Sequence, residues 1–300
     1  MNAHDIASAI AQHHAHMLAG EPQSYAQAQA PSDSPLTPEM AGVLQGCRML
    51  GFLEHDAQCV MHAWRQQSLR LGSFDLHAWP MHASDFGVAP WPRAQSFAPC
   101  PHALGLYAVL PDAQWVGRMA RAGVPTVQLR FKSDDTDAIA REVRAAVAAV
   151  QGTQALLFIN DHWQAAIDAG AYGVHLGQED MADAPLQTIR DAGLRLGLST
   201  HGYAEMLRAD AVSPSYIALG AVFPTTLKRM ATAPQGMGRL QAYARLMQQH
   251  PLVAIGGIDE ARLPAVLQTG VGSVAMVRAI TDAPDPAARA QGFMKIMQSV

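Results

Sequence analysis

The stretch INDHWQAAIDAGAYGVHLGQED, residues 159–180, has the pattern of a strand, a helix and a second strand. An apolar run ends on Asp161, the segment HWQAAIDAGA has helical spacing and stops on Gly170, and a second short apolar run ends just before Asp180. Two strands joined in this way are parallel, with a right-handed crossover. Their carboxyl ends are then neighbours, roughly 5 Å apart across a sheet, so two carboxylates displayed there can share a hard cation such as Mg²⁺.

Each of these acids also has a simpler explanation. Asp is a favoured N-cap residue, and an Asp after a strand often does no more than begin the next helix. Capping explains either acid alone, but it gives no reason why both acids should follow strands that are neighbours. We therefore predict a metal site at Asp161 and Asp180 and test it against the rest of the chain.

Composition and charge exclude several classes of protein. A formal net charge of −4 over 300 residues provides no basic field for nucleic acid. No long uninterrupted apolar segment is present, so we expect a soluble protein without a membrane partner. The first residues lack the basic and apolar regions of a secretory signal, and we expect a cytoplasmic location. Cys47, Cys59 and Cys100 have no CxxC spacing and are expected to be free thiols.

The first third of the chain differs from the remainder in composition and in the regularity of its apolar pattern. Residues 1–100 are expected to form an N-terminal extension of unknown function. It is linker-like over 20–38, where Pro, Ser, Gln and Ala dominate, helical over about 39–71, and irregular over 72–100. The prolines and aromatic residues of the last part could pack as a strap over another surface. Nothing in the pattern decides an oligomeric state, and a homo-oligomer stays open.

From Gly105 onward, short apolar runs alternate with helical segments to the end of the chain. Eight such pairs predict a (β/α)8 TIM barrel over residues 101–300. A doubly wound open sheet is the alternative, but no GxGxxG follows the first run. In a barrel, function belongs at the carboxyl ends of the strands. The predicted strands are GLYAVL, TVQLRFK, ALLFIND, GVHLGQ, LRLGLSTH, YIALGAVFP, PLVAIGGI and SVAMVRAI.

Hydrogen-bond donors lie on the second predicted strand and at the end of the fifth. Gln128, Arg130 and Lys132 stand at i, i+2 and i+4, which places them on one face of a strand and suits them to an anion. A solvated edge strand is the alternative, but strands in a closed barrel have no free edge. The fifth run ends in Ser199, Thr200 and His201, donors that bind phosphate oxygens but also make ordinary turns.

Two later loops also indicate anion binding. After the sixth run, FPTTLKR and MATAPQGMG form a polar loop typical of a mobile phosphate-closing segment, although its Lys228 could be a plain surface lysine. The seventh run ends in Gly256 and Gly257, and the eighth covers 273–280. Barrels often bind a phosphate through backbone N–H groups of these two loops, where Gly permits close approach.

Two anion sites and a metal predict two phosphorylated small-molecule substrates that meet over the barrel mouth. No Ser-His-Asp, Cys-His or zinc-type spacing can be identified in the sequence. The chemistry that remains is the departure of a diphosphate, stabilised by metal and cations, with positioning supplying much of the rest.

The segment from about Gly105 to the end resembles the thiamine phosphate synthase family. The resemblance implies condensation of 4-amino-2-methyl-5-hydroxymethylpyrimidine diphosphate with 4-methyl-5-(2-phosphoethyl)thiazole, giving thiamine phosphate and diphosphate. In that family diphosphate leaves first, a carbocation stabilised by the aminopyrimidine forms, and the thiazole nitrogen captures it. The matching pieces are VQLRFK, FINDHW, GVHLGQED, LGLSTH, YIALGAVFPTTLKRMATAPQG and VAIGGI.

The resemblance also implies roles for individual residues. Asp161 and Asp180 match the family's Mg²⁺ ligands, so Mg²⁺ is the expected cofactor. Thr225 and the backbone around Gly257 match the thiazole phosphate site. Groups that hold the pyrimidine diphosphate are matched by Gln128, Arg130, Lys132, Asn160, Ser199 and Lys228, and of these Lys228, Ser199 and Arg130 are expected to assist catalysis.

The sequence departs from the family at three places. The family usually has Thr-x-Thr-Lys where this chain has TTLK, so one hydroxyl is lost or displaced to Thr226. Where the family often has a VVSAI-like last strand, this chain has Val277 and Arg278, and the arginine could add a charge-assisted phosphate contact or point away. Phe131 replaces a position that is commonly charged.

Two other functions compete with the synthase. A thiazole tautomerase uses the same barrel, but it would be expected to lose the metal and diphosphate groups, whereas Asp161, Asp180 and Lys132 are present. A non-catalytic regulator that binds the thiazole phosphate or the pyrimidine is the other alternative, with residues 1–100 as its output domain.

Overall fold

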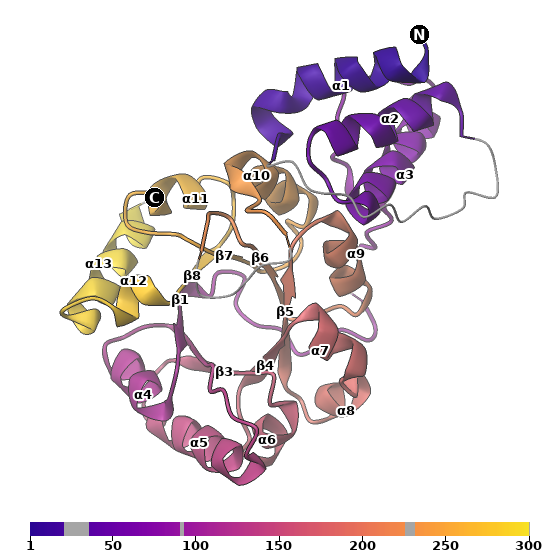
Figure 1. Cartoon of the computed structure of the whole chain (residues 1–300). Helices are drawn as coiled ribbons and strands as arrows, with labels where there is room; N and C mark the ends of the chain where they lie inside the picture. The colour runs from indigo at the N-terminus through magenta and orange to yellow at the C-terminus, as the bar shows by residue number, and fades with distance from the viewer. Residues whose placement is uncertain (21–35, 91–92, 226–231, 300) are drawn as a thin grey trace.

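A closed barrel of parallel strands forms the centre of the molecule (Figure 1). A computed structural model describes residues 1–20, 36–90, 93–225 and 232–299. The strands pair in sequence order and the last closes on the first, which confirms the predicted (β/α)8 barrel. The strands are β1 Gly105–Leu110, β2 Thr126–Leu129, β3 Leu156–Asn160, β4 Gly173–Leu176, β5 Arg195–Thr200, β6 Tyr216–Leu219, β7 Leu252–Ile255 and β8 Ser273–Met276.

The strands end earlier than the sequence predicted, and the difference moves several site residues off the sheet. Leu110 pairs with Leu129 in the last register position of β1 and β2. The Arg130 N–H still donates to the Leu110 carbonyl at 2.7 Å, but Pro111 follows and cannot continue the ladder. Arg130 and Lys132 therefore lie beyond β2, and the expected strand face of Gln128, Arg130 and Lys132 was wrong in its last two members.

Asp180, expected just after a strand, and Arg278, expected within the last strand, both belong to short helices. Asp180 lies in α7, which follows β4, and Arg278 begins α12, which follows β8. The helices of the described ranges are α1 Ala3–Leu18, α2 Pro38–Met49, α3 Glu54–Leu71, η1 Ala83–Phe86, α4 Ala113–Arg121, α5 Thr136–Ala149, α6 Trp163–Asp168, α7 Gln178–Asp183, α8 Leu186–Asp191, α9 Tyr203–Ala211, α10 Gly236–Leu246, α11 Leu263–Leu267, α12 Arg278–Thr281 and α13 Pro286–Ser299. None of them has the length and apolar character that a membrane span requires.

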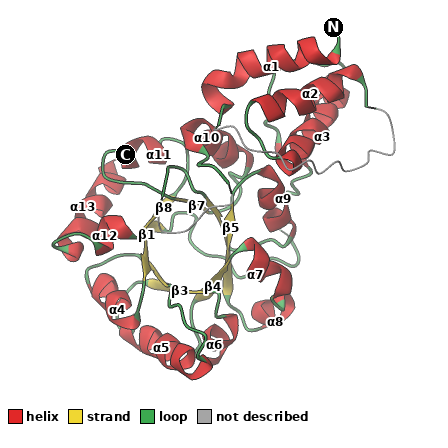
Figure 2. Ribbon diagram, viewed as in Figure 1, coloured by secondary structure: helices red, strands yellow, loops and turns green. Residues whose placement is uncertain are grey.

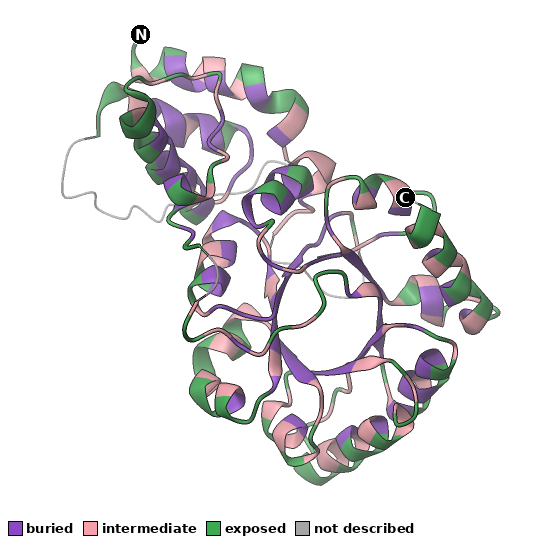
Figure 3. Ribbon diagram, turned by 180° about the vertical axis from the view of Figure 1, so that it is seen from behind, coloured by how far each residue is buried: buried purple, intermediate pink, exposed green. Residues whose placement is uncertain are grey.

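Side chains pack on both faces of the strands. Tyr107, Phe158 and Tyr216 belong to a cluster inside the barrel, and a larger cluster fills the space between the strands and the surrounding helices. Figure 3 shows the strands buried and the outer faces of the helices exposed. Because strands covered on both faces read as nearly continuous apolar runs, this packing explains the pattern from which the barrel was predicted.

Helices α1, α2 and α3 lie together outside the barrel, beside α9 and α10 (Figures 1 and 2). Asp56 of α3 accepts a hydrogen bond from the Ala204 N–H at 2.8 Å and so caps the first turn of α9. In the other direction, Arg239 of α10 donates to the carbonyls of Leu18 and Leu50, where α1 and α2 end. Each side of this contact therefore satisfies helix ends of the other side.

A strap of residues 97–104 crosses the amino-terminal end of the barrel. The Phe97 N–H donates to the Ser213 carbonyl at 3.0 Å, and the Ser215 hydroxyl donates to the Ala98 carbonyl at 2.6 Å. Further along, the Leu104 N–H donates to the Ser273 hydroxyl at 2.7 Å, at the start of β8. This strap covers one end of the barrel and leaves the carboxyl ends of the strands open.

Candidate active site

A cavity of about 580 Å³ opens at the carboxyl ends of the strands. Its wall is made of strand ends and of the loops that follow them, where a barrel places its function. It brings together most of the residues that were predicted from the sequence. These are Gln128, Arg130, Asn160, Asp161, Asp180, Ser199, Thr225, Gly257, Val277 and Arg278.

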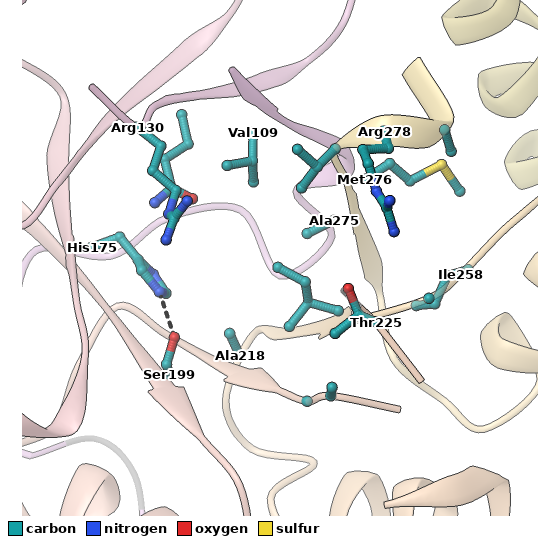
Figure 4. Close-up of a pocket in the computed structure, with 18 of the residues that line it drawn as sticks. Val109, Arg130, His175, Ser199, Ala218, Thr225, Ile258, Ala275, Met276 and Arg278 are labelled. Atoms are coloured by element: carbon teal, nitrogen blue, oxygen red, sulfur yellow. Dashed lines mark hydrogen bonds between the residues drawn. The ribbon is translucent and has the colours of Figure 1, made fainter. Parts of the chain in front are cut away.

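Three predicted residues are not described as part of this wall. Lys132 is exposed and does not line the cavity. Thr226 and Lys228 lie outside the described residues. The described wall therefore includes Arg130 and Arg278 from the predicted cationic residues, and Figure 4 places these two arginines on opposite sides of the pocket.

A row of hydrogen-bonded polar side chains ends at Asp161. Gln128, which is buried in β2, donates to the Asn160 side-chain oxygen at 2.7 Å, and the Asn160 amide donates to the Asp161 carboxylate. Asp161 itself has φ 63°, a left-handed conformation that is uncommon for residues other than Gly. Its N–H remains bonded to the His175 carbonyl at 3.0 Å, so the backbone around this acid is held from both sides.

Asp180 combines the two interpretations that the sequence left open. Its carboxylate accepts a hydrogen bond from the Gly177 N–H at 3.3 Å and so caps the start of α7. It also lies close enough to Asp161 for their charges to interact. Capping and proximity are compatible because a carboxylate has two oxygens with several acceptor positions.

The pKa of Asp161 is raised, first because the surrounding protein removes water from its carboxyl and second because the Asp180 carboxylate is near. A divalent cation between the two acids would relieve that repulsion. Among the described residues no group of three or more His, Cys, Asp or Glu side chains could hold a metal ion. Mg²⁺ is commonly bound by one or two carboxylates together with substrate phosphates, and this pair fits such an ion.

A serine and a histidine meet at the cavity wall, which the sequence analysis did not predict. The His175 Nε2 and the Ser199 Oγ are 2.8 Å apart, as the dashed line in Figure 4 shows. His175 belongs to β4 and Ser199 to β5. They are 24 positions apart in the sequence, and only the pairing of the two strands brings them together.

Glycines shape the opposite part of the wall. Gly256 and Gly257 have φ 106° and 63°, and a Cβ on Gly257 would lie 2.6 Å from the Pro224 carbonyl. The N–H groups of Gly257 and Ile258 donate no hydrogen bond within the described ranges. These groups are available to an anion, and only glycine allows this close approach of the backbone.

Arg262 was not predicted as a site residue, because its segment has the spacing of a helix. Its guanidinium donates to the Gly257 carbonyl at 2.6 Å and lies 4.5 Å from the centre of the Phe223 ring. It lines the cavity together with Asp259. Nothing in its sequence position distinguishes it from a surface arginine, so its place near the glycine loop follows from the fold alone.

Comparison with known proteins gives a consistent result. The sequence model of the family described as thiamine monophosphate synthase matches residues 106–280. The thiamine-phosphate synthase of Neisseria meningitidis serogroup B is 56% identical over 201 residues, which cover 67% of this chain and 98% of that protein. The thiamine-phosphate synthase of Cronobacter sakazakii is 57% identical over 190 residues, covering 63% of this chain and 90% of that protein.

Among solved structures, a thiamine phosphate pyrophosphorylase from Pyrococcus furiosus is similar with a TM-score of 0.58 and 27% sequence identity. The similarity covers 65% of this chain and 96% of that chain. The remaining third of this chain therefore has no counterpart in that structure.

Proposed function

Because the chain belongs to the thiamine monophosphate synthase family, we propose that it joins the two substrates of that synthesis. It is a transferase that condenses 4-amino-2-methyl-5-hydroxymethylpyrimidine diphosphate with 4-methyl-5-(2-phosphoethyl)thiazole. The products are thiamine phosphate and diphosphate. The observation that carries the proposal is the single cavity wall that presents an acid pair at one side and a glycine loop at another.

The diphosphate of the pyrimidine substrate binds at Asp161, Asp180 and Arg130. Mg²⁺ held between the two acids would neutralise charge that develops on the departing diphosphate. Arg130 supplies fixed positive charge from the same part of the wall. Lys228 and Thr226, outside the described residues, and the exposed Lys132 are proposed to contact the same anion.

The pyrimidine ring binds beside Gln128 and Asn160. These amides are already joined by a hydrogen bond of 2.7 Å, so their orientation is fixed before the substrate enters. An oriented amide pair can hold the aminopyrimidine while the bond to diphosphate breaks. Positioning of the ring toward the second substrate is then the main contribution of these two residues.

The phosphate of the thiazole binds at the glycine loop. This side of the cavity is lined by the N–H groups around Gly257, the hydroxyl of Thr225 and the guanidinium of Arg278. Val277, which joins β8 to α12, also lines the cavity. Phosphate binding at this loop is proposed to direct the thiazole nitrogen toward the pyrimidine carbon from which diphosphate departs. Capture of the pyrimidine carbon by that nitrogen completes the reaction.

The division of the chain supports a separate role for its first part. The family match begins at residue 106, and we propose that residues 1–100 form an extension to a catalytic barrel of residues 101–300. The contacts of Asp56 and Arg239 with the barrel helices favour a role in stabilising the barrel.

Formation of thiamine phosphate by the purified full chain tests the proposal. With Mg²⁺ and both substrates present, we expect thiamine phosphate and diphosphate in equal amounts, and neither product when one substrate is omitted. An isomerase would alter the thiazole without the pyrimidine diphosphate, and a binding protein would bind a substrate without turnover. Either of these results would refute the synthase.

A further inference from the structure

Four polar side chains form a continuous hydrogen-bonded chain inside the barrel. The hydroxyls of Tyr107 in β1 and Tyr216 in β6 are 2.8 Å apart. The Tyr216 hydroxyl is 2.7 Å from the His175 Nδ1, and the His175 Nε2 is 2.8 Å from the Ser199 Oγ. The chain therefore runs from the apolar interior of the barrel to the cavity wall, and its four members come from four different strands.

A glycine in β5 leaves room for these hydrogen-bonded side chains. A Cβ on Gly197 of β5 would lie 2.3 Å from the Tyr216 hydroxyl and 2.1 Å from its ring, so only glycine fits at that position. The His175 ring also stacks on the Tyr216 ring, with 5.6 Å between centroids and 20° between planes. The imidazole is thus fixed by stacking as well as by hydrogen bonds at both nitrogens.

Tyr107 determines the direction of the hydrogen bonds. It is 1% exposed, and Tyr216 is the partner that its hydroxyl has in the described part of the chain. Burial raises the pKa of both phenols, so both keep their protons. If Tyr216 donated to Tyr107, the buried Tyr107 O–H would have no acceptor, at a cost of about 1–3 kcal/mol. Tyr107 therefore donates to Tyr216.

The remaining directions follow from this first one. Tyr216 accepts from Tyr107, so its own O–H donates to the His175 Nδ1. A neutral imidazole that accepts at Nδ1 carries its proton at Nε2. The Nε2–H then donates to the Ser199 oxygen, and the Ser199 proton has to point to another acceptor.

We propose that Tyr107, Tyr216 and His175 are positioning residues that fix the Ser199 hydroxyl as a hydrogen-bond donor into the cavity. This inference rests on the proposed function for the identity of the acceptor, which is an oxygen of the substrate diphosphate. It also assigns a role to the Ser199 and His175 pair. A serine nucleophile needs a histidine that accepts its proton, and an Nε2–H imidazole cannot do so.

The tautomer of His175 tests the proposal without any assay of activity. In wild-type protein labelled with ¹⁵N-histidine, the His175 signals are assigned by comparison with His175→Gln and read for the position of the ring proton. We expect a neutral imidazole with its proton on Nε2. A proton on Nδ1, or a doubly protonated ring at neutral pH, would overturn the proposal, whether or not the chain is a synthase.

Substitutions of His175 and Ser199 test the positioning role of the hydrogen-bonded side chains. Gln at position 175 has an oxygen that can accept from Tyr216 and an amide that can donate to Ser199, whereas Leu has neither. We expect His175→Gln to retain kcat within about threefold of wild type and His175→Leu to lose about 100-fold, similar to Ser199→Ala, with small changes in KM. Equal kcat values for His175→Gln and His175→Leu would overturn the role.

Tyr107→Phe removes the donor that sets the direction, and Tyr172→Phe is its matched control. Tyr172 also packs on Phe158, with 5.4 Å between ring centroids, but it does not belong to the chain. We expect Tyr107→Phe to populate both tautomers of His175 and to lower kcat severalfold, and Tyr172→Phe to change neither. An unchanged tautomer in folded Tyr107→Phe would contradict the assigned direction. If Tyr107→Phe does not fold, the wild-type spectrum and the position-175 variants test the proposal in its place.

Discussion

Arg278 is the residue at which this chain departs most clearly from the family pattern. It begins α12, lines the cavity and lies across the pocket from Arg130 (Figure 4). On the proposed function it contacts the thiazole phosphate, because the glycine loop is on the same side of the wall. A guanidinium can offer a charge-assisted contact that a serine hydroxyl cannot match.

Arg278→Ser restores the residue type that the family pattern has. A hydrogen bond to a charged group is worth about 1.5–3 kcal/mol, so we expect KM for the thiazole phosphate to rise about tenfold or more while KM for the pyrimidine diphosphate stays close to wild type. Steady-state kinetics with each substrate varied in turn measures both. Arg289→Ser, in α13, is the control. Equal changes in the two KM values would contradict the assignment.

At the scale of single residues, most of the predicted site residues lie in one cavity, and the exceptions have physical causes. Asp161, Asn160 and Gln128 follow directly from strand ends, and the structure places them in one hydrogen-bonded row. His175 could not be paired with Ser199 in advance, because that pairing depends on the register of β4 and β5. Register is set by packing of the whole barrel rather than by either segment alone.

At the scale of elements, the contact between α3 and α9 depends on a buried acid. Burial raises the pKa of Asp56 from 3.8 to about 6, while the Ala204 N–H, Arg239 and His55 lower it and Glu205 raises it. The folded state therefore binds a proton at Asp56 more tightly than the unfolded chain does. For this group, stability decreases as pH rises from about 3.8 through about 6 and levels off above that pH.

Asp56→Asn keeps an oxygen that can cap α9 and removes the charge. We expect the free energy of unfolding of Asp56→Asn, relative to wild type, to increase by about 1 kcal/mol between pH 5 and pH 7. Denaturant unfolding at the two pH values gives this double difference, in which other titrating groups cancel. Asp56→Ala, which loses the cap, should be less stable than Asp56→Asn at both pH values. A relative stability of Asp56→Asn that does not change with pH would contradict this account.

Arg239 has the complementary role on α10. Its side chain is buried, donates to the Leu18 and Leu50 carbonyls and lies 3.9 Å from the centre of the Phe52 ring. Lysine has a single nitrogen and no flat face, so it cannot donate from two nitrogens and stack on a ring at the same time. We expect Arg239→Lys to lower the free energy of unfolding by about 2 kcal/mol, measured by denaturant titration. The exposed Arg245 of the same helix is the control, and equal losses for Arg239→Lys and Arg245→Lys would contradict the assigned contact.

The strands of the barrel were predicted from the sequence, whereas two short helices were missed. All strands of the barrel were found, because their apolar runs are bounded by polar or glycine residues. Helices α7 and α12 were assigned to strands or loops, since neither QEDMAD nor RAIT shows a helical repeat of apolar residues. Helix α6, also six residues long, was recognised from the spacing of its apolar residues. Asp180 and Arg278 therefore lie in helices rather than at the end of a strand or within one.

At the scale of the whole molecule, the extension and the barrel share an aromatic cluster. Tyr203 of α9 is 1% exposed, stacks on Phe86 with 5.1 Å between centroids, and accepts a hydrogen bond from the Trp79 ring N–H at 3.1 Å. The sequence allowed a strap over another surface but gave no means of identifying that surface. The partners of these aromatic residues are more than a hundred positions away, and no local pattern records them.

Removal of residues 1–90 would delete Trp79 and Phe86 and so expose Tyr203. It would also remove the Leu18 and Leu50 carbonyls that accept from Arg239. We expect the shortened chain to unfold at a temperature at least several degrees lower than the full chain. Thermal unfolding followed by circular dichroism measures the difference. An unchanged unfolding temperature, with full activity, would show that the extension does not stabilise the barrel.

The central claim is that Asp161 and Asp180 hold the Mg²⁺-diphosphate of the substrate, and the Mg²⁺ dependence of thiamine phosphate formation in wild type and Asp161→Asn tests it most directly. Asn tolerates the left-handed conformation that Asp161 adopts at φ 63°, so this change removes charge with little strain. Asp168→Asn in α6 is the control. We predict a loss of about 100-fold in turnover and a higher Mg²⁺ requirement for Asp161→Asn alone. Wild-type turnover with an unchanged Mg²⁺ response in Asp161→Asn would contradict the account.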